Sequence, residues 1–285
     1  MTPAPQRILV VANETVGGRA LIDAVKQRAE DAHAKGVPFH VSVVCPQNRP
    51  RHGYVVYDES VRAAADNRLK MTLAQLRQVG IEAEGEVMDP DPYHATMDAL
   101  DHYGADEIII STHPSTRSGW LRRDLVDRVR DSSGLPVDHV VVDLDLDRAQ
   151  STRTLVVANQ TVGGEPLIGL LAGKAAESPH SFIVICPQGG VESDGDPYQR
   201  LAKTLERMRT AGLDAVGQVM DPDPFTAIQN ALQFYAVDEI VISTFPGSRS
   251  GWLRNDLIDR VQASTALPVE HVVVGSKDSR QETPA

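Results

Sequence analysis

Residues 7–18 read RILVVANETVGG and residues 153–164 read RTLVVANQTVGG, so ten of twelve positions agree. A second pair of stretches agrees at 15 of 21 positions: ADEIIISTHPSTRSGWLRRDL at 105–125 and VDEIVISTFPGSRSGWLRNDL at 237–257. Agreement over two separate blocks indicates that the chain is a tandem repeat of one structural unit.

The repeat predicts two domains of ordinary size. We place the first at residues 1–146 and the second at residues 147–285, because the polar stretch 143–152, DLDLDRAQST, lies between the copies. Residues 275–285, at the end of the chain, are expected to form a flexible tail.

Within each copy, apolar runs typical of strands alternate with helical patterns. Residues 8–12 are continuously apolar, as in a strand buried on both faces, and Leu69, Leu73 and Leu76 recur at helical spacing. Such alternation predicts parallel sheets covered by helices, and right-handed crossovers restrict them to a doubly wound form. The expected fold class is therefore α/β, with two tandem doubly wound parallel five-stranded sheets. The strands expected in the first copy are 8–12, 37–45, 81–88, 107–112 and 137–142, with a last helix at 118–130.

The composition is that of an acidic globular protein. Hydrophobic residues make up 41% of the chain, charged residues 24%, and the formal net charge is −11. A negative surface repels nucleic acid and anionic lipid, so we expect neither as a partner. No apolar run approaches the roughly 20 residues of a membrane-spanning helix, and no secretory signal is recognisable. The two cysteines are too few for a disulfide framework, and we expect a cytoplasmic protein.

The two copies resemble the universal stress protein family in a tandem two-domain form. The resemblance covers nearly the whole chain and rests on ILVVAN-x-T at 8–15, DEIIISTH at 106–113 and LPVDHVVV at 135–142, with their repeats. It implies the strand order 3-2-1-4-5, an adenine nucleotide alpha hydrolase-like arrangement. It also implies pairing through the fifth strand, either between the two domains of the chain or in a homodimer. Some members of this family bind ATP, so the resemblance implies ATP or another adenine nucleotide as ligand.

The ATP-binding signature of that family is degenerate in this chain. Members that bind ATP have an aspartate after the first strand, where this sequence has Asn13 and Asn159. Their glycine-rich signature follows the fourth strand, and its first two glycines fall on Ser111 and Pro114 in the first copy.

Each copy nevertheless contains the residues of an anion site. After the fourth strand both have Ser-Thr-x-Pro-x-x-Arg-Ser-Gly-Trp-Leu-Arg, in which Ser118 can cap a helix and Arg117 offers a fork of donors. Thr15-Val16-Gly17-Gly18 opens another helix, whose free N–H groups favour anions. The ligand of a doubly wound sheet lies where the strand order reverses, here between the first and fourth strands. The predicted ligand-binding residues are Ala12, Asn13, Thr15, Gly17, Gly18, Val44, Ser111, Thr112, Arg117, Ser118, Ala158, Asn159, Thr161, Gly163, Gly164, Ile185, Ser243, Thr244, Arg249 and Ser250.

Other interpretations of these motifs stay open. Arg117 can instead pair with Asp124 on its own helix, and the two glycines can simply form a tight turn. The motif DPDP at 89–92 and 221–224 can supply carboxylates to Mg²⁺ or a ribose, but Asp-Pro is also common at turns and helix starts.

The cysteines and the repeated histidines fit structural roles better than chemical ones. Cys45 and Cys186 end the second strand of each copy and are expected to be small buried residues, with a reactive thiol as the alternative. His139 and His271 are expected at an interface or in a structural contact, because no second metal ligand lies at useful spacing. We therefore predict no metal site.

No phosphate-binding loop, dinucleotide turn or nucleophile elbow is present in the sequence. We therefore expect a non-catalytic, stress-linked regulatory protein that binds a nucleotide or similar small anion in each domain. One alternative is an interaction and dimerisation module with an empty nucleotide site. A second alternative is a weak nucleotide hydrolase.

Overall fold

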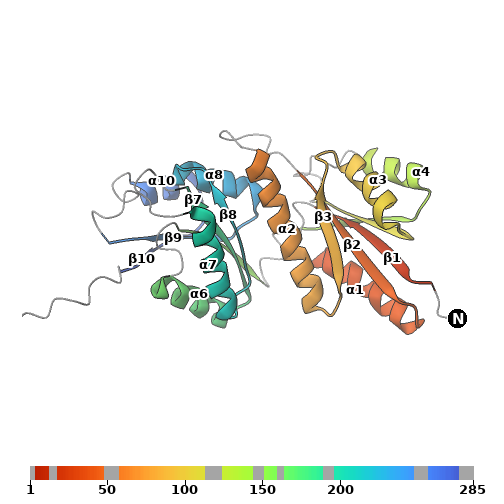
Figure 1. The fold of residues 1–285 in the computed structure, drawn as a ribbon, viewed down its shortest axis with the longest axis horizontal. Helices are drawn as coiled ribbons and strands as arrows, with labels where there is room; N and C mark the ends of the chain where they lie inside the picture. Colours follow the sequence, from red (N-terminus) through yellow and green to blue (C-terminus); the bar gives the residue numbers. More distant parts are fainter. Residues whose placement is uncertain are drawn as a thin grey trace, which may run out of the picture. The chain divides into compact units, whose positions relative to one another are not determined.

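The computed structural model describes residues 4–12, 18–47, 58–112, 124–143, 151–158, 164–188, 196–246 and 256–275 (Figure 1). These residues form two compact units, one within 4–143 and one within 151–275. The domain boundary placed after residue 146 and the tail beyond Gly275 lie outside the described residues. None of the helices described has the length and apolar character needed to cross a bilayer.

The first unit alternates strands with helices and builds one parallel sheet. Its elements are β1 (Gln6–Val11), α1 (Arg19–Ala34), β2 (Phe39–Pro46), α2 (Asp58–Gln78), β3 (Ala83–Met88), α3 (Pro92–Tyr103), β4 (Glu107–Thr112), α4 (Asp124–Ser133) and β5 (Val137–Val141). The strands lie in the order β3-β2-β1-β4-β5, and every neighbouring pair is parallel.

The second unit repeats this arrangement. Its elements are β6 (Thr152–Val157), α6 (Glu165–Glu177), β7 (His180–Pro187), α7 (Pro197–Thr210), β8 (Ala215–Met220), α8 (Pro224–Phe234), β9 (Glu239–Thr244), α10 (Leu257–Ser264) and β10 (Val269–Val273). The strand order is β8-β7-β6-β9-β10, again all parallel. The predicted fold class is thereby confirmed: α/β, with two parallel five-stranded sheets, each in the order 3-2-1-4-5.

The boundaries of individual elements differ from the sequence prediction by a few residues. The second strand begins at Phe39 and not at residue 37, because the N–H of Val37 donates to the carbonyl of Ala32 and closes α1. Gly80 follows α2 with φ +81°, the left-handed backbone expected of a helix-closing glycine. The last helix of the first copy, expected at 118–130, is described only from Asp124 and continues to Ser133.

The core lies between the sheet and the helices on its two faces. In the first unit, α3 and α4 pack on the face that carries Leu9, Val11 and Ile110. At Gly85 of β3, an added Cβ would lie 2.1 Å from the carbonyl oxygen of Val43 on β2 and 3.1 Å from Leu69 Cδ1 of α2. A glycine is therefore needed at this point of the sheet. The central strands β1 and β4 are consequently buried, and their carboxyl ends lie next to each other.

Candidate functional site

The strand order of each unit reverses between its two central strands, and this places several predicted ligand-binding residues at one edge. The N–H of Ala12, which follows β1, donates to the carbonyl of Val44 at 3.0 Å. Val11 is paired with Ile110, so Ser111 is the next residue on the adjoining strand. In the second unit the N–H of Ala158 donates to the carbonyl of Ile185 at 3.2 Å. The structure thus brings together residues of three strands at the carboxyl edge of each sheet.

Two buried hydroxyl groups end the fourth strand of each unit. Ser111 and Thr112 are 1% and 3% exposed, and Ser243 and Thr244 are 1% and 2% exposed. Since neighbouring residues of a strand point to opposite faces, each pair offers one hydroxyl on either side of the sheet edge.

The helices that follow β1 and β6 differ at their N-termini from three other helices that start at this edge. Gly18 and Gly164 precede α1 and α6, and no described side chain caps these two helices. By contrast, α3, α7 and α8 each begin after an aspartate whose carboxylate accepts from backbone N–H groups: Asp91, Asp196 and Asp223. A glycine N-terminus leaves N–H donors directed toward the edge, where they would favour an anion.

Half of the predicted ligand-binding residues lie outside the part of the chain that the structure describes, and their roles stay predictions. They are Asn13, Thr15, Gly17, Arg117, Ser118, Asn159, Thr161, Gly163, Arg249 and Ser250.

The aspartates of the DPDP motifs have turn and helix-cap roles. Asp91 accepts from the N–H groups of Tyr93 and His94 at 2.9 and 3.1 Å, and Asp89 accepts from the N–H of Asp91 at 2.8 Å. The second copy repeats this pattern at Asp223, which caps α8. These contacts confirm the interpretation as a turn followed by a helix start.

Each repeated cysteine lies beside an arginine, buried at Arg68 and half-buried at Arg200, an arrangement that the sequence analysis missed. Cys45 and Cys186 are free and 0% exposed, as predicted for small buried residues. Burial raises the pKa of the Cys45 thiol, and the charge of Arg68 opposes that rise without overcoming it. Arg200 has the same effect on Cys186, whose pKa is also raised. A raised pKa and a covered sulfur both disfavour the reactive-thiol alternative. The only signal in the sequence was the recurrence of both residue types in both copies.

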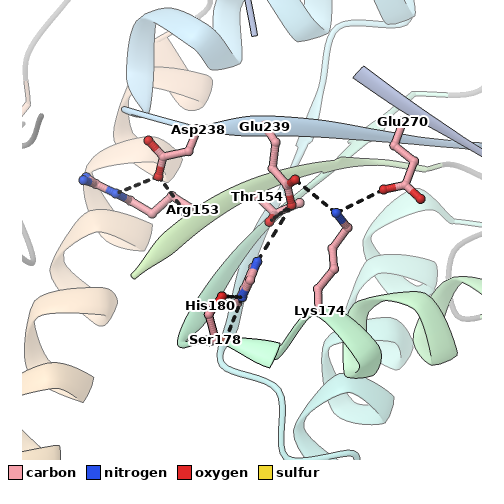
Figure 2. A network of polar contacts seen from close by, with 8 residues as sticks. All are labelled: Arg153, Thr154, Lys174, Ser178, His180, Asp238, Glu239 and Glu270. Carbon is pink, nitrogen blue, oxygen red and sulfur yellow. Dashed lines mark hydrogen bonds and ion pairs between the residues drawn. The ribbon is translucent and has the colours of Figure 1, made fainter. Parts of the chain in front are cut away.

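A cluster of charged side chains lies at the opposite, amino-terminal edge of the second sheet (Figure 2). The ammonium of Lys174 on α6 lies 3.0 Å from carboxylate oxygens of both Glu239 and Glu270. Glu239 also accepts from the Thr154 hydroxyl at 2.7 Å, and His180 Nε2 lies 4.0 Å from it. We call these residues the amino-edge network.

The first unit has the same ion pairs at the equivalent positions. Arg28 on α1 contacts Glu107 at 2.6 Å and Asp138 at 2.7 Å. Burial lowers the pKa of Lys174, but its hydrogen bonds to the two glutamates outweigh this effect and raise the pKa overall. An amine that keeps its proton is no nucleophile or base, so the amino-edge network braces a helix against two strands.

Among the described residues, no three His, Cys, Asp or Glu side chains lie together in a way that could hold a metal ion. The described residues of the carboxyl edge offer hydroxyl and backbone N–H groups for hydrogen bonding.

No family model matches the chain, and no curated protein sequence matches it. The chain is similar to several solved structures of universal stress proteins from Archaeoglobus fulgidus. One is 24% identical, covers 47% of this chain and 93% of its own, and has a TM-score of 0.34. Another, in complex with dAMP, is 22% identical over 49% of this chain and 99% of its own, with a TM-score of 0.34. A third is 15% identical over 95% of this chain and 97% of its own, with a TM-score of 0.38. At these TM-scores, the fold assignment rests on the strand order of the two sheets.

Proposed function

We propose that each unit binds an adenine nucleotide or a similar small anion at the carboxyl edge of its sheet. In the first unit the site lies between β1 and β4, and in the second between β6 and β9. We further propose that binding serves a non-catalytic, stress-linked regulatory role. The ligand class and the regulatory role follow the resemblance of the sequence motifs to universal stress proteins.

The observation that carries the proposal is the combination of donors at this edge. Gly18 and Gly164 begin helices that no described side chain caps, and buried Ser-Thr pairs end β4 and β9 beside them. Backbone N–H groups and hydroxyls are the donors that bind phosphate oxygens in proteins. Because both units repeat the arrangement, the proposal predicts two sites in each chain.

Calorimetric titration of the nucleotide-free full chain with ATP tests the proposal. We expect saturable binding that is lost when Arg117→Ala and Arg249→Ala are combined, with an almost unchanged thermal midpoint. The matched control combines Arg77→Ala and Arg209→Ala, which remove two exposed arginines at the ends of α2 and α7. This control should bind ATP like the wild-type chain. A chain that binds no ATP, and whose melting temperature millimolar nucleotide does not raise, would contradict the proposal.

A second candidate function is an interaction module that pairs through the fifth strands. β5 and β10 are edge strands, and each ends in a half-exposed valine: Val141 and Val273 are both 47% exposed. Edge strands with apolar side chains favour pairing with another strand. If this candidate is correct, the combined variant Val141→Lys and Val273→Lys will lower the molecular mass measured by light scattering or increase the radius of gyration of the chain. The wild-type chain will then bind no nucleotide.

A further inference from the structure

Each unit contains a hydrogen bond between a histidine of its last strand and the threonine that ends the strand before it. The bond joins His139 Nε2 to Thr112 Oγ1 at 2.7 Å and His271 Nε2 to Thr244 Oγ1 at 2.8 Å. Both threonines are almost completely buried, at 3% and 2% exposure. Because both threonines belong to the proposed anion site, each histidine contacts that site through a hydroxyl group.

The register of the strands produces this contact. His139 is paired with Ile110, and Thr112 lies two residues further along β4, so the ring and the hydroxyl share one face of the sheet. In the second unit His271 is paired with Ile242 in the same way. A register shift of one residue would carry the ring to the other face. The repeated contact is thus built into both sheets.

A hydrogen bond of this kind has two arrangements of the proton. If Nε2 carries no proton, the threonine hydroxyl donates its hydrogen bond to the ring. The hydroxyl can then only accept hydrogen bonds from other groups. If Nε2 carries a proton, the ring donates to Oγ1, and the hydroxyl proton is released for another acceptor. The second arrangement requires either the Nε2–H tautomer or uptake of one proton from solvent to form imidazolium.

We propose that His139 and His271 are positioning residues, which turn the Thr112 and Thr244 hydroxyl protons toward a bound ligand and so select ligands rich in hydrogen-bond acceptors, such as phosphates. This inference rests on the proposed function and adds the origin of its selectivity. An anion at the site accepts a hydrogen bond from the freed hydroxyl and thereby favours uptake of a proton by the ring to form imidazolium. By linkage, protonation of the ring strengthens anion binding, and affinity falls as pH rises through the pKa of the histidine.

The described surroundings of His139 leave the threonine as its principal polar contact on this face. The side chains packed there from β4 and α4 are apolar: Ile108, Ile110, Leu125, Val126 and Val129. Arg130 on α4 donates to the Val137 carbonyl at 3.3 Å and to Asp127 at 2.8 Å. The carboxylate of Asp138 is on the opposite face, where Arg28 of α1 binds it. Arg130 and Asp138, the charged residues named here, thus each have an oppositely charged partner.

The second unit has equivalent surroundings. On the face of the sheet that carries His271, β9 contributes the buried Ile240 and Ile242, and α10 contributes the buried Leu257 and Val261. On α10 the charged side chains of Asp259 and Arg260 are exposed, and Arg260 lies over the Phe225 ring. Glu270 is on the opposite face and is bound by Lys174. Burial lowers the pKa of His271, which favours the neutral form of its ring.

The test measures the ATP affinity of the full chain from pH 5.5 to 8.0 in three forms. They are the wild type, the combined His139→Gln and His271→Gln variant, and the combined Thr112→Val and Thr244→Val variant. Glutamine keeps a hydrogen-bonding amide but does not titrate, and valine replaces the threonine hydroxyl with a methyl group of similar size. ATP itself titrates in this range, so each variant is compared with the wild type as a ratio of Kd values at the same pH.

We expect the Kd of the glutamine variant divided by the Kd of the wild type to fall roughly three- to tenfold as pH rises. Only the wild type binds ATP more tightly when its histidine rings are protonated at low pH. The valine variant should bind roughly three- to tenfold more weakly at low pH and follow the pH profile of the glutamine variant. A ratio that is the same at every pH overturns the inference, while ATP binding by the wild type leaves the proposed function standing. If the wild type binds no ATP at any pH, the proposed function fails and this inference fails with it.

Nitrogen-15 NMR of the wild-type histidines gives a second readout that needs no folded variant. We expect Nε2 of His139 and His271 to be protonated in the ATP-saturated chain at pH 7 and to accept a hydrogen bond without ATP. If Nε2 of these rings still accepts a hydrogen bond when the chain is saturated with ATP, the inference is overturned.

Discussion

Replacing Lys174 by methionine should destabilise the second unit, because it removes the only cation that contacts two carboxylates of the amino-edge network within the described residues. Lys174 lies 3.0 Å from both Glu239 and Glu270, and its side chain is 20% exposed. Methionine keeps the length, the flexibility and the helix propensity of the lysine side chain. The substitution therefore removes the charge and little else.

The magnitude follows from the burial of the carboxylates that are left behind. Glu239 is 19% exposed and Glu270 is 45% exposed, so the cost falls mainly on Glu239. Breaking a fully buried ion pair costs about 3–5 kcal/mol, whereas an exposed pair contributes about 0–1 kcal/mol. For this intermediate site, to which the Thr154 hydroxyl still donates, we expect a loss of about 1–3 kcal/mol in the free energy of unfolding.

Urea denaturation of the full chain, followed by circular dichroism, measures the loss. We expect a thermal midpoint lowered by about 3–10 °C in a parallel heating experiment. The matched control is Lys174→Arg, which introduces the residue that the first unit has at the equivalent position, Arg28, and should unfold like the wild type. If Lys174→Met changes the free energy by less than about 0.5 kcal/mol, or if Lys174→Arg is equally damaging, the reasoning is refuted.

The pH dependence of this difference gives an additional check. The pKa of Lys174 is raised above its ordinary value of 10.5 in the folded chain. A raised pKa means that its contribution is complete below the unfolded value and is lost as pH rises through the folded value. The stability difference between the wild type and Lys174→Met should therefore shrink above pH 10.5.

Three further predictions follow from other contacts. Burial and a hydrogen bond to Glu86 raise the pKa of Tyr103 to about 12, so ultraviolet titration should show one of the six tyrosines ionising late, and Glu86→Gln should bring it earlier. Gly85→Ala should lower the free energy of unfolding by about 1–3 kcal/mol, because the added Cβ would clash with the backbone of β2. Its control Gly173→Ala, which has nothing within 4 Å of the added Cβ, should stabilise α6 by about 0.5–1 kcal/mol. Equal effects of the two variants in urea denaturation would contradict this prediction. Asp91→Ala should cost about 1 kcal/mol through the lost cap of α3, and an unchanged urea midpoint would show that the cap contributes nothing.

Much of the fold could be predicted because its signals are local. Apolar runs and helical spacing predicted the alternation of strands and helices, and the repeated blocks predicted that one arrangement occurs twice. The strand order came from the resemblance of the motifs, and the structure confirms it in both units. Errors were confined to the ends of elements, as at Phe39, where backbone hydrogen bonds of the preceding helix set the start of β2.

The ligand-binding roles of the candidate residues stay predictions. The sequence predicted that the ends of the first and fourth strands meet, and the structure places Ala12, Val44 and Ser111 at one edge of the sheet. The sequence also suggested a structural contact for His139, but not that its partner would be Thr112. That pairing depends on the register of β5 against β4, which no local pattern specifies.

The sequence by itself determined that this protein is two copies of an α/β unit, because hydrophobic periodicity and internal repetition are written along the chain. Only the tertiary structure decided which polar groups meet. Lys174 and Glu239 are 65 residues apart, and Arg28 and Asp138 are 110 residues apart. Such contacts form when folding buries charged and hydroxyl groups that must then find partners, and that choice depends on packing and register in three dimensions.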